Sequence, residues 1–486
     1  MKKISINPIT RLEGHGKIEI FLDDDGNVSN AYLQVPELRG FEQFCIGRPV
    51  EELPRITPRI CGVCPMAHHM ASTKTVDAVY NIKPTPTAVK LRNLVYDAYI
   101  MEDHLLHFFF LGGPDFIVTP SAPPEERNIL GVIGKVGLEI GTKVIATRRK
   151  IREIVTHLSG RIIHPVGGLP GGVSKNLIEE KRKEFLKYAK QALEFAQESI
   201  KIFNDIVLKN DKYLDLIVGD IYKHKTYYMG LVDENNKVNF YDGKVRVVDP
   251  EGKEILKFEA KDYLKYIAEH VEPWSYMKFP FLKKIGWKGF VDGKNSGVYR
   301  VAPLGRLNAS NGMATPIAQV KYEKMYDKLG GKPAHNTLAF HWARLIEVIY
   351  AAEHMVELLK DKTITSPDIR NLPTGVPNEG VGITEAARGT LFHHYKTDEN
   401  GIVTAVNLLV ATVANAAGMS MSIAKAAQKL IKNSKVNDGL LNMVEMAFRA
   451  YDPCLACATH SLPGKTPLIV NIHNNAGNII KTIRRD

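Results

Sequence analysis

The chain has 486 residues, of which 44% are hydrophobic and 24% charged, a composition typical of a globular protein with a large core. Its net charge is +11, but the basic residues are scattered in short runs, which argues against nucleic-acid binding. No apolar run is long enough to cross a bilayer, and the first residues lack the apolar core of a signal peptide, so we expect a cytoplasmic protein without direct membrane insertion.

The first half of the chain begins with strands and then turns helical. Residues 4–35 alternate around an Asp-Gly-Asn turn, which predicts a β-hairpin. Residues 84–112 and 124–158 predict helices. In 174–210, apolar residues recur at alternating steps of three and four, which indicates a long amphipathic helix.

The second half mixes strands, loops and helices. Residues 226–260 predict two or three short antiparallel strands with Asp-Gly and Glu-Gly turns, a β insertion in a helical protein. A long helix is expected at 333–361, a loop-rich segment around TEAARGTLFHHY, a strand or short turn at IVTAVNLLVAT, and helices to about residue 450. No repeat or linker separates domains. We therefore expect one mainly α unit with small antiparallel β parts, an α+β fold.

Four of the five cysteines form two C-x-x-C pairs near opposite ends of the chain, Cys61 with Cys64 and Cys454 with Cys457. Five cysteines are too few for a disulfide scaffold. Four thiolates suit zinc, an iron–sulfur cluster or another late transition metal. Zinc ribbons usually hold both pairs within a short stretch, so a site shared by the two ends of this chain would be unusual. The pairs can meet only if both ends fold onto one core.

The residues that flank the cysteines carry a specific resemblance. RICGVCPMAHH resembles the first metal-binding signature of the nickel–iron hydrogenase large subunit, R-x-C-G-x-C-x-x-x-H, and DPCLACATH resembles the second, D-P-C-x-x-C-x-x-H. RLEGHG, RGFE, GRIIHPVGGLPGG and AARG resemble further signatures of that family and follow in the expected order. The resemblance spans residues 11–460 and implies the helical core of that family.

The resemblance implies a nickel–iron centre that carries carbon monoxide and cyanide on the iron. Mapped by motif, Cys61 and Cys454 would bind nickel terminally, and Cys64 and Cys457 would bridge nickel and iron. Polarisable sulfur ligands suit nickel, and the metals would supply the chemistry that the protein orients. The implied reaction is the reversible heterolytic cleavage of dihydrogen to protons and electrons.

The resemblance also implies a route for the proton. Cys454 is the expected first acceptor, and Glu13 of RLEGH is the expected relay, because a carboxyl group in such an environment can have its pKa moved towards working pH. The alternative for Glu13 is a buried carboxylate paired with Arg11 or Arg39.

Two further groups are expected around the metals. Arg388 of AARG would point its guanidinium over them, with Asp103 as its carboxylate partner; a simple buried ion pair is the alternative. Ala411 and Thr412 of LLVAT match positions that hold a cyanide by hydrogen bonding.

A magnesium-like site is implied beside the centre. Its ligands would be Glu42 of RGFE, His460 and a backbone carbonyl near Leu408, and such oxygen ligands suit a hard cation that keeps its waters.

The remaining histidines near the motifs have less definite expectations. His164 of GRIIHP is expected to face the nearest iron–sulfur cluster of a partner, or to pack in a tight loop. His68 is expected to lie just behind the metal ligands. No function is predicted for His69, His393 or His394.

Residues 461–486 are expected to be a C-terminal propeptide. PLIVNI and IIKTIR flank an Asn-Asn-Ala-Gly turn and predict a hairpin. In the family, a dedicated maturation endopeptidase removes such a tail behind the histidine after nickel-insertion proteins have loaded the metal. The mature chain would then be a single large-subunit domain, 1–460.

The resemblance implies partners, because only Cys45 remains and it is expected to be an ordinary buried residue. Electrons must leave through a small subunit that carries iron–sulfur clusters. The short chain, the GHG start, the β insertion and DPCLACATH favour the cytoplasmic viologen-reducing, deazaflavin-non-reducing group, which is coupled to heterodisulfide reductase through a further electron-transfer subunit.

Other functions remain as alternatives. A deazaflavin-reducing or NAD(P)-linked bidirectional hydrogenase would share the same motifs. A non-catalytic relative, like the corresponding subunit of respiratory complex I, has lost the cysteines that are present here. A structural zinc protein with four cysteine ligands would explain the four sulfurs but not Glu13, Glu42 or Arg388.

Overall fold

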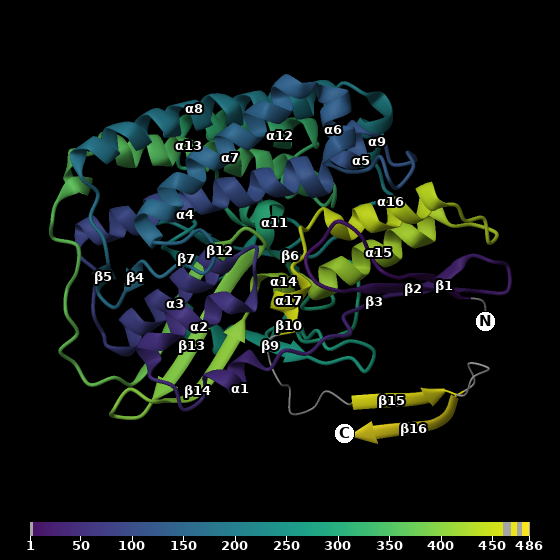
Figure 1. Ribbon diagram of the computed structural model, residues 1–486. Coiled ribbons are helices and arrows are strands. Elements are labelled where there is room, and N and C mark those ends of the chain that lie inside the picture. The colour runs from purple at the N-terminus through teal and green to yellow at the C-terminus, as the bar shows by residue number, and fades with distance from the viewer. Residues whose placement is uncertain (1–2, 460–467, 474–478, 486) are drawn as a thin grey trace.

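A layer of long helices forms the largest part of the structure, a computed structural model that describes residues 3–459, 468–473 and 479–485. The long helices are α4 (Pro86–Leu106), α7 (Leu138–Ser159), α8 (Glu179–Phe203) and α13 (Ala339–Lys360). Helix α13 packs against α4 and α8, and α7 packs against the same two helices (Figure 1). Most side chains of α13 are buried, so this helix belongs to the core and offers little surface to a partner.

Two of the expected helices differ in extent from the sequence prediction. The stretch 124–158 forms two helices, α6 (Ile129–Val136) and α7, because Gly137 between them has a φ of 92°, which glycine adopts without strain. The helix predicted over 174–210 begins later, at Glu179, as α8. It then continues into a π-helical turn, η4 (Asn204–Leu208). Helix α4 likewise continues into η3 (His107–Gly112).

The structure corrects the prediction of a loop around TEAARGTLFHHY. That segment forms β12 (Glu379–Ala386) and β13 (Gly389–Thr397), which pair antiparallel and continue to β14 (Val403–Leu409). Both faces of the β12–β13 hairpin are largely buried, so its sequence lacks the alternation of polar and apolar residues that marks a half-exposed strand.

Helix α3 (Pro65–Val79) lies against this sheet at very short range (Figure 1). A Cβ atom at Gly382 of β12 would lie 2.4 Å from the carbonyl oxygen of Ala71 in α3. Only glycine permits this approach, so the sheet fixes the position of the helix that follows the first cysteine pair.

The smaller sheets follow the sequence prediction closely. The N-terminal segment forms a three-stranded sheet. The β insertion forms three antiparallel strands, and a fourth strand from residues 299–300 pairs in parallel with the first of them. The strands of these sheets are β1 (Lys3–Ile6), β2 (Lys17–Leu22), β3 (Val28–Gln34), β6 (Tyr227–Val232), β7 (Lys244–Val248), β8 (Glu254–Phe258) and β11 (Tyr299–Arg300). The predicted hairpin of the tail forms from β15 (Leu468–His473) and β16 (Ile479–Arg485).

Shorter elements connect these parts. The remaining strands are β4 (Gly168–Leu169), β5 (Gly172–Val173), β9 (Ile267–His270) and β10 (Phe279–Leu282). The remaining helices are α1 (Phe41–Cys45), α2 (Leu53–Ile56), α5 (Pro114–Ile117), α9 (Asp211–Val218), α10 (Tyr263–Tyr266), α11 (Ala302–Ala309), α12 (Pro316–Lys328), α14 (Ala411–Ala414), α15 (Ala416–Leu430), α16 (Asp438–Arg449) and α17 (Leu455–Ala458), with 3₁₀ turns η1 (Val50–Glu52), η2 (Thr57–Ile60), η5 (Ala260–Asp262) and η6 (Lys362–Thr365). Among the residues that the structure describes, no helix is long and apolar enough to cross a membrane.

Candidate metal centre

The two cysteine pairs meet in the interior, as the sequence predicted. Cys61 follows η2 and Cys64 precedes α3, whereas Cys454 precedes α17 and Cys457 lies within it. The Sγ atoms are 3.0 Å apart for Cys61 and Cys454, 3.3 Å for Cys64 and Cys457, and 2.9 Å for Cys454 and Cys457. All four sulfurs are buried and lie within 4.8 Å of one another.

This sulfur cluster fits a thiolate-bound metal group. Backbone N–H groups of Val63 and Cys64 donate to Cys61 Sγ at 3.2 and 3.3 Å, an arrangement that favours a thiolate. Burial raises the pKa of the Cys454 and Cys457 thiols well above its usual value. Burial also opposes ionisation of Cys61. Hydrogen bonds from the other three thiols outweigh this effect and hold the pKa of Cys61 well below its usual value. Four thiolates in this volume therefore require a positively charged metal group to bind them.

Glu13 touches the centre from the N-terminal end of the chain. Its Oε2 lies 2.9 Å from Cys454 Sγ and accepts a hydrogen bond from the N–H of Ala456 at 3.1 Å. Burial, and then the charge of Cys61, raise the pKa of this carboxyl group. The alternative ion pairs are not seen in the described structure, because Arg11 pairs with a different carboxylate and Arg39 donates to backbone carbonyls.

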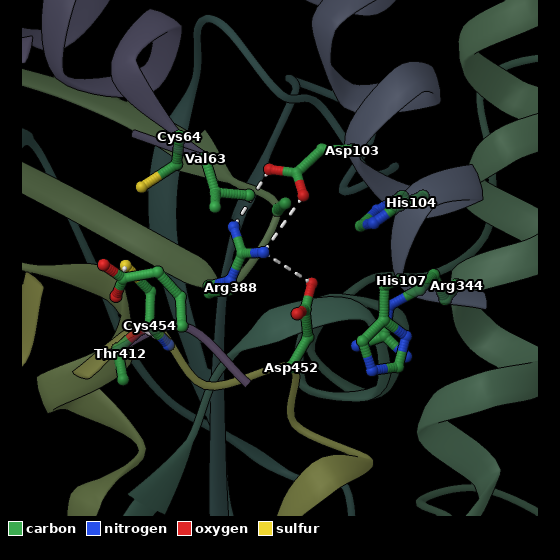
Figure 2. Close-up of polar contacts among 12 residues, drawn as sticks. Val63, Cys64, Asp103, His104, His107, Arg344, Arg388, Thr412, Asp452 and Cys454 are labelled. Atoms are coloured by element: carbon green, nitrogen blue, oxygen red, sulfur yellow. Dashed lines mark hydrogen bonds and ion pairs between the residues drawn. The ribbon is translucent and has the colours of Figure 1, made fainter. Parts of the chain in front are cut away.

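Arg388 lies in the turn between β12 and β13, where it meets two buried carboxylates. Its Nη1 and Nη2 atoms donate to Asp103 at 2.9 and 3.0 Å, and Nη2 also lies 2.9 Å from Asp452 Oδ2. Figure 2 shows the guanidinium between these carboxylates, with Cys64 and Cys454 close enough to contribute to its charge environment. The side-chain amide of Asn415 donates to the Arg388 carbonyl at 3.1 Å and holds the turn in place.

Asp452 is a site residue that the sequence prediction missed. It is the first residue of the DPC signature, so its position was visible in the motif, but nothing in the sequence paired it with Arg388. Burial raises the pKa of Asp452 to about 7, although the Arg388 charge opposes that shift. Its φ of 58° is unusual for a residue other than glycine. This backbone conformation at Asp452 sets the direction in which the chain enters Cys454.

Thr412 and Ala411 begin α14 beside the sulfurs. The Thr412 hydroxyl oxygen accepts from the backbone N–H of Cys454 at 3.2 Å, and both residues are buried. Glu42 and Leu408 also come together, since the Leu408 N–H donates to Glu42 Oε1 at 2.7 Å. His460, the third expected member of the Glu42 group, lies outside the described residues.

Three histidines of the motifs lie in or beside the loops around the centre: His69, for which no function was predicted, and His68 and His164, for which positions were expected. His69 Nε2 accepts from the N–H of Gly168 at 2.8 Å, and its Nδ1 lies 2.7 Å from the carbonyl of Pro54. His68 Nε2 lies 3.5 Å from Cys457 Sγ. His164, with a φ of 56°, is half-buried in its loop.

Cys45 takes no part in the sulfur cluster. It is fully buried, and burial raises the pKa of its thiol to about 12, so it remains protonated and inert.

Comparisons with known proteins give a consistent result. The family model described as nickel-dependent hydrogenase matches residues 39–128 and 216–460, and a model described as HoxL-like matches 3–38. The chain is 52% identical to an F420-non-reducing hydrogenase iron-sulfur subunit of Archaeoglobus profundus, with all of both chains covered. It is 42% identical to an F420-non-reducing hydrogenase subunit of Methanothermobacter marburgensis, covering 99% of this chain and 100% of that one.

Solved structures agree with these matches. A structure of the NAD+-reducing [NiFe]-hydrogenase in the H2-reduced state superposes with a TM-score of 0.88 at 35% identity, and it covers 95% of this chain and 100% of its own. A Ni-Fe-Se hydrogenase from D. vulgaris Hildenborough has the same fold, with a TM-score of 0.76 at 24% identity over 94% of this chain and 100% of its own.

Proposed function

The chain belongs to the nickel-dependent hydrogenase family, and on that premise we propose that it is the catalytic large subunit of an F420-non-reducing nickel–iron hydrogenase that cleaves dihydrogen reversibly. The observation that carries this proposal is the cluster of four buried Sγ atoms, all within 4.8 Å, assembled from both ends of the chain. Such a set is polarisable and closed to water, as a redox-active thiolate centre requires.

Cys61, Cys64, Cys454 and Cys457 would together hold a nickel–iron group whose iron carries carbon monoxide and cyanide. This group, when bound, supplies the heterolytic cleavage of dihydrogen and the storage of its electrons.

The protein's part in the reaction is to receive and move the proton. Cys454 Sγ would take it first, and Glu13 Oε2, 2.9 Å away, would take it from the sulfur. The raised pKa of Glu13 supports this role, because its carboxyl group then accepts a proton more readily than an ordinary glutamate does. The Ala456 N–H keeps the receiving oxygen turned towards the sulfur.

Arg388, Asp103 and Asp452 would form the opposite wall of the centre. A guanidinium held by two carboxylates is fixed in orientation, so its charge would act on the reacting atoms without rearrangement. Ala411 and Thr412 would hold a cyanide, and Glu42, His460 and the carbonyl of Leu408 would hold a magnesium ion. These assignments follow the family motifs, and the contact of the Leu408 N–H with Glu42 supports the placement of Glu42 beside Leu408.

A small subunit with iron–sulfur clusters would dock beside the loop of the first cysteine pair, where Gly62 is exposed. A small pocket of about 120 Å³ connects the loop at Gly62 and Val63 to Ile163. Ile163 lines this pocket with its side chain 47% exposed, and Ile145, exposed by 59%, lines a neighbouring pocket that shares Arg148, Arg152 and Ile162 with it. Exposed apolar residues above a redox centre support a docking face for the electron-accepting partner.

Further partners complete the proposal. The 42–52% identity to F420-non-reducing subunits favours that group of hydrogenases. For this chain we propose a route for the electrons through a further electron-transfer subunit to heterodisulfide reductase. Nickel-insertion proteins and a maturation endopeptidase would act on the precursor, and the endopeptidase would leave 1–460 as the mature large-subunit domain.

An infrared spectrum of the complex purified from its native host tests this function. We expect intense bands from iron-bound carbon monoxide and cyanide, together with stoichiometric nickel. A correctly processed chain that binds zinc, or no metal, and lacks these bands would return the four cysteines to a structural role.

A further inference from the structure

Arg306 is a fully buried residue of α11 that contacts the turn between β12 and β13. Its Nε and Nη2 atoms donate to the two carboxylate oxygens of Glu347, each at 2.6 Å, and Nη1 donates to Glu385 at 2.8 Å. Nη1 also donates to the carbonyl of Ala386 at 2.8 Å, and Nη2 to that of Ala387 at 3.4 Å. All five N–H groups of the guanidinium therefore have acceptors, which fixes the orientation of this side chain.

The turn that Arg306 contacts is buried, so its backbone carbonyls need acceptor contacts from within the protein. Ala387 and Arg388 are the two residues of the turn, and both are buried. Arg306 donates to the carbonyl of Ala387 and to that of the residue before it, and the side-chain amide of Asn415 donates to the carbonyl of Arg388 at 3.1 Å. Because a buried carbonyl without a partner is costly, these two side chains fix the backbone that carries Arg388.

Glu347 extends the same network to the carboxylate partner of Arg388. Its Oε2 also lies 2.9 Å from Nε2 of His104. Burial opposes ionisation of Glu347, but the charge of Arg306 outweighs this effect and holds the pKa of Glu347 below its usual value, so the carboxylate accepts from His104. His104 follows Asp103 in α4 (Figure 2), and Asp103 accepts the two hydrogen bonds from Arg388. The buried pair of Arg306 and Glu347 therefore supports both members of the Arg388–Asp103 pair.

We propose that Arg306 and Asn415 are positioning residues that hold the β12–β13 turn and thereby aim the Arg388 guanidinium at the metals. The proposal rests on the proposed function, because it takes Arg388 as part of the metal centre. A lysine in place of Arg306 would keep the positive charge, but its ammonium has only three N–H groups and no planar fork. It cannot serve both carboxylates and both carbonyls, so the turn, and with it Arg388, would lose its fixed position.

The test is Arg306→Lys in the assembled, metal-loaded complex, with turnover per nickel and the infrared spectrum measured on the same preparation. A misplacement of about 1 Å can lower a rate by about 10²-fold, so we expect a loss of this order in turnover per nickel. A guanidinium turned away from the metals leaves more electron density on the iron, so the carbon monoxide and cyanide bands should move to lower wavenumber. Asn415→Ala, which removes the contact with the Arg388 carbonyl, should move them in the same direction.

Two comparisons separate positioning from an ordinary loss of stability. Arg182→Lys is the matched control, because Arg182 is only 6% exposed, binds Glu179 through two hydrogen bonds and donates to the carbonyl of Leu359. It should lower the thermal stability but leave turnover per nickel and the infrared bands in place. In an Arg388→Lys background there is no guanidinium left to aim, so adding Arg306→Lys should move the bands no further.

The outcomes are distinct. Wild-type bands and turnover per nickel in Arg306→Lys, or an equal shift of the bands in the Arg388→Lys background, would overturn the positioning role while leaving the proposed function intact. If Arg306→Lys does not assemble, Asn415→Ala decides, and unmoved bands in that variant would overturn the role. Absence of the bands from the wild-type complex would overturn the proposed function, and the positioning role with it.

Discussion

At the scale of single residues, the centre depends on side chains that are held by partners far away in the sequence. Glu13 reaches Cys454 because a short parallel bridge joins their backbones, with the Leu455 N–H donating to the Glu13 carbonyl at 2.9 Å. Gly14 permits this bridge, since a Cβ atom there would lie 2.9 Å from the Ala456 nitrogen, and its φ of 86° suits glycine. The N-terminal segment is therefore part of the site.

Glu13→Gln should abolish most hydrogen turnover while leaving the centre in place. The amide keeps the shape and still accepts from Ala456, but it cannot take a proton from sulfur, so we expect a loss of about 10²–10⁴-fold in rate. Turnover and nickel content would be measured on the same preparation. Glu37→Gln, at a side chain that is 42% exposed, is the control and should keep normal turnover. Unchanged turnover in Glu13→Gln would show that Glu13 does not relay the proton.

Asp103→Ala should destabilise the protein more than Asp452→Ala. Asp103 accepts two hydrogen bonds from Arg388 and is fully buried, so its loss leaves a buried guanidinium with one partner. Breaking a buried pair of this kind costs about 3–5 kcal/mol. Denaturant unfolding of both variants would measure the difference, and equal effects would show that Arg388 does not depend on the bidentate contact.

At the scale of elements, the position of the first cysteine pair depends on how α3 packs on the sheet β12–β14. The strand β12 approaches α3 so closely at Gly380 and Gly382 that any side chain there would collide with the helix backbone. Because Cys64 immediately precedes α3, a shift of the helix is a shift of the metal ligand.

Gly382→Val should therefore impair metal loading as well as stability. Its Cβ would lie 2.4 Å from the Ala71 carbonyl oxygen and 2.5 Å from the Thr75 nitrogen, so the helix must move. Overpacking of this kind costs about 1–3 kcal/mol. Nickel content and thermal unfolding are the measurements. Gly134→Ala is the control, because an added Cβ there meets nothing within 4 Å, and it should change neither nickel content nor thermal unfolding. Full nickel loading in Gly382→Val would show that the position of α3 does not control the first cysteine pair.

At the scale of the whole molecule, the loop of Gly62 beside the sulfur cluster reaches the surface. Leu138, Ile145 and Ile163 remain exposed although they are apolar, which costs solubility unless a partner covers them. Ile163 lines the pocket beside Gly62 and Val63, so this face is the expected contact of the small subunit.

A charged residue on this face should separate the subunits without emptying the centre. For Ile163→Glu we expect a loss of about 2 kcal/mol or more in association, as for a buried interface residue. Co-purification of the small subunit and the nickel content of this chain would be measured together. Leu372→Glu is the control, because Leu372 is an apolar residue that is 70% exposed and lies outside this pocket. Normal assembly of Ile163→Glu would place the interface on another face.

The sequence by itself determined the family, the mainly α fold and the four cysteines of the sulfur cluster, because their C-x-x-C spacing and flanking residues form recognisable motifs at both ends of the chain. It did not determine the β12–β13 hairpin, because burial on both faces removes the alternating pattern that marks a strand. It also did not indicate which side chains Asp452 and His393 contact. Only the tertiary structure brought Asp452 to Arg388 and His393 to His68, since a side chain's contacts across the fold depend on packing and not on neighbouring residues.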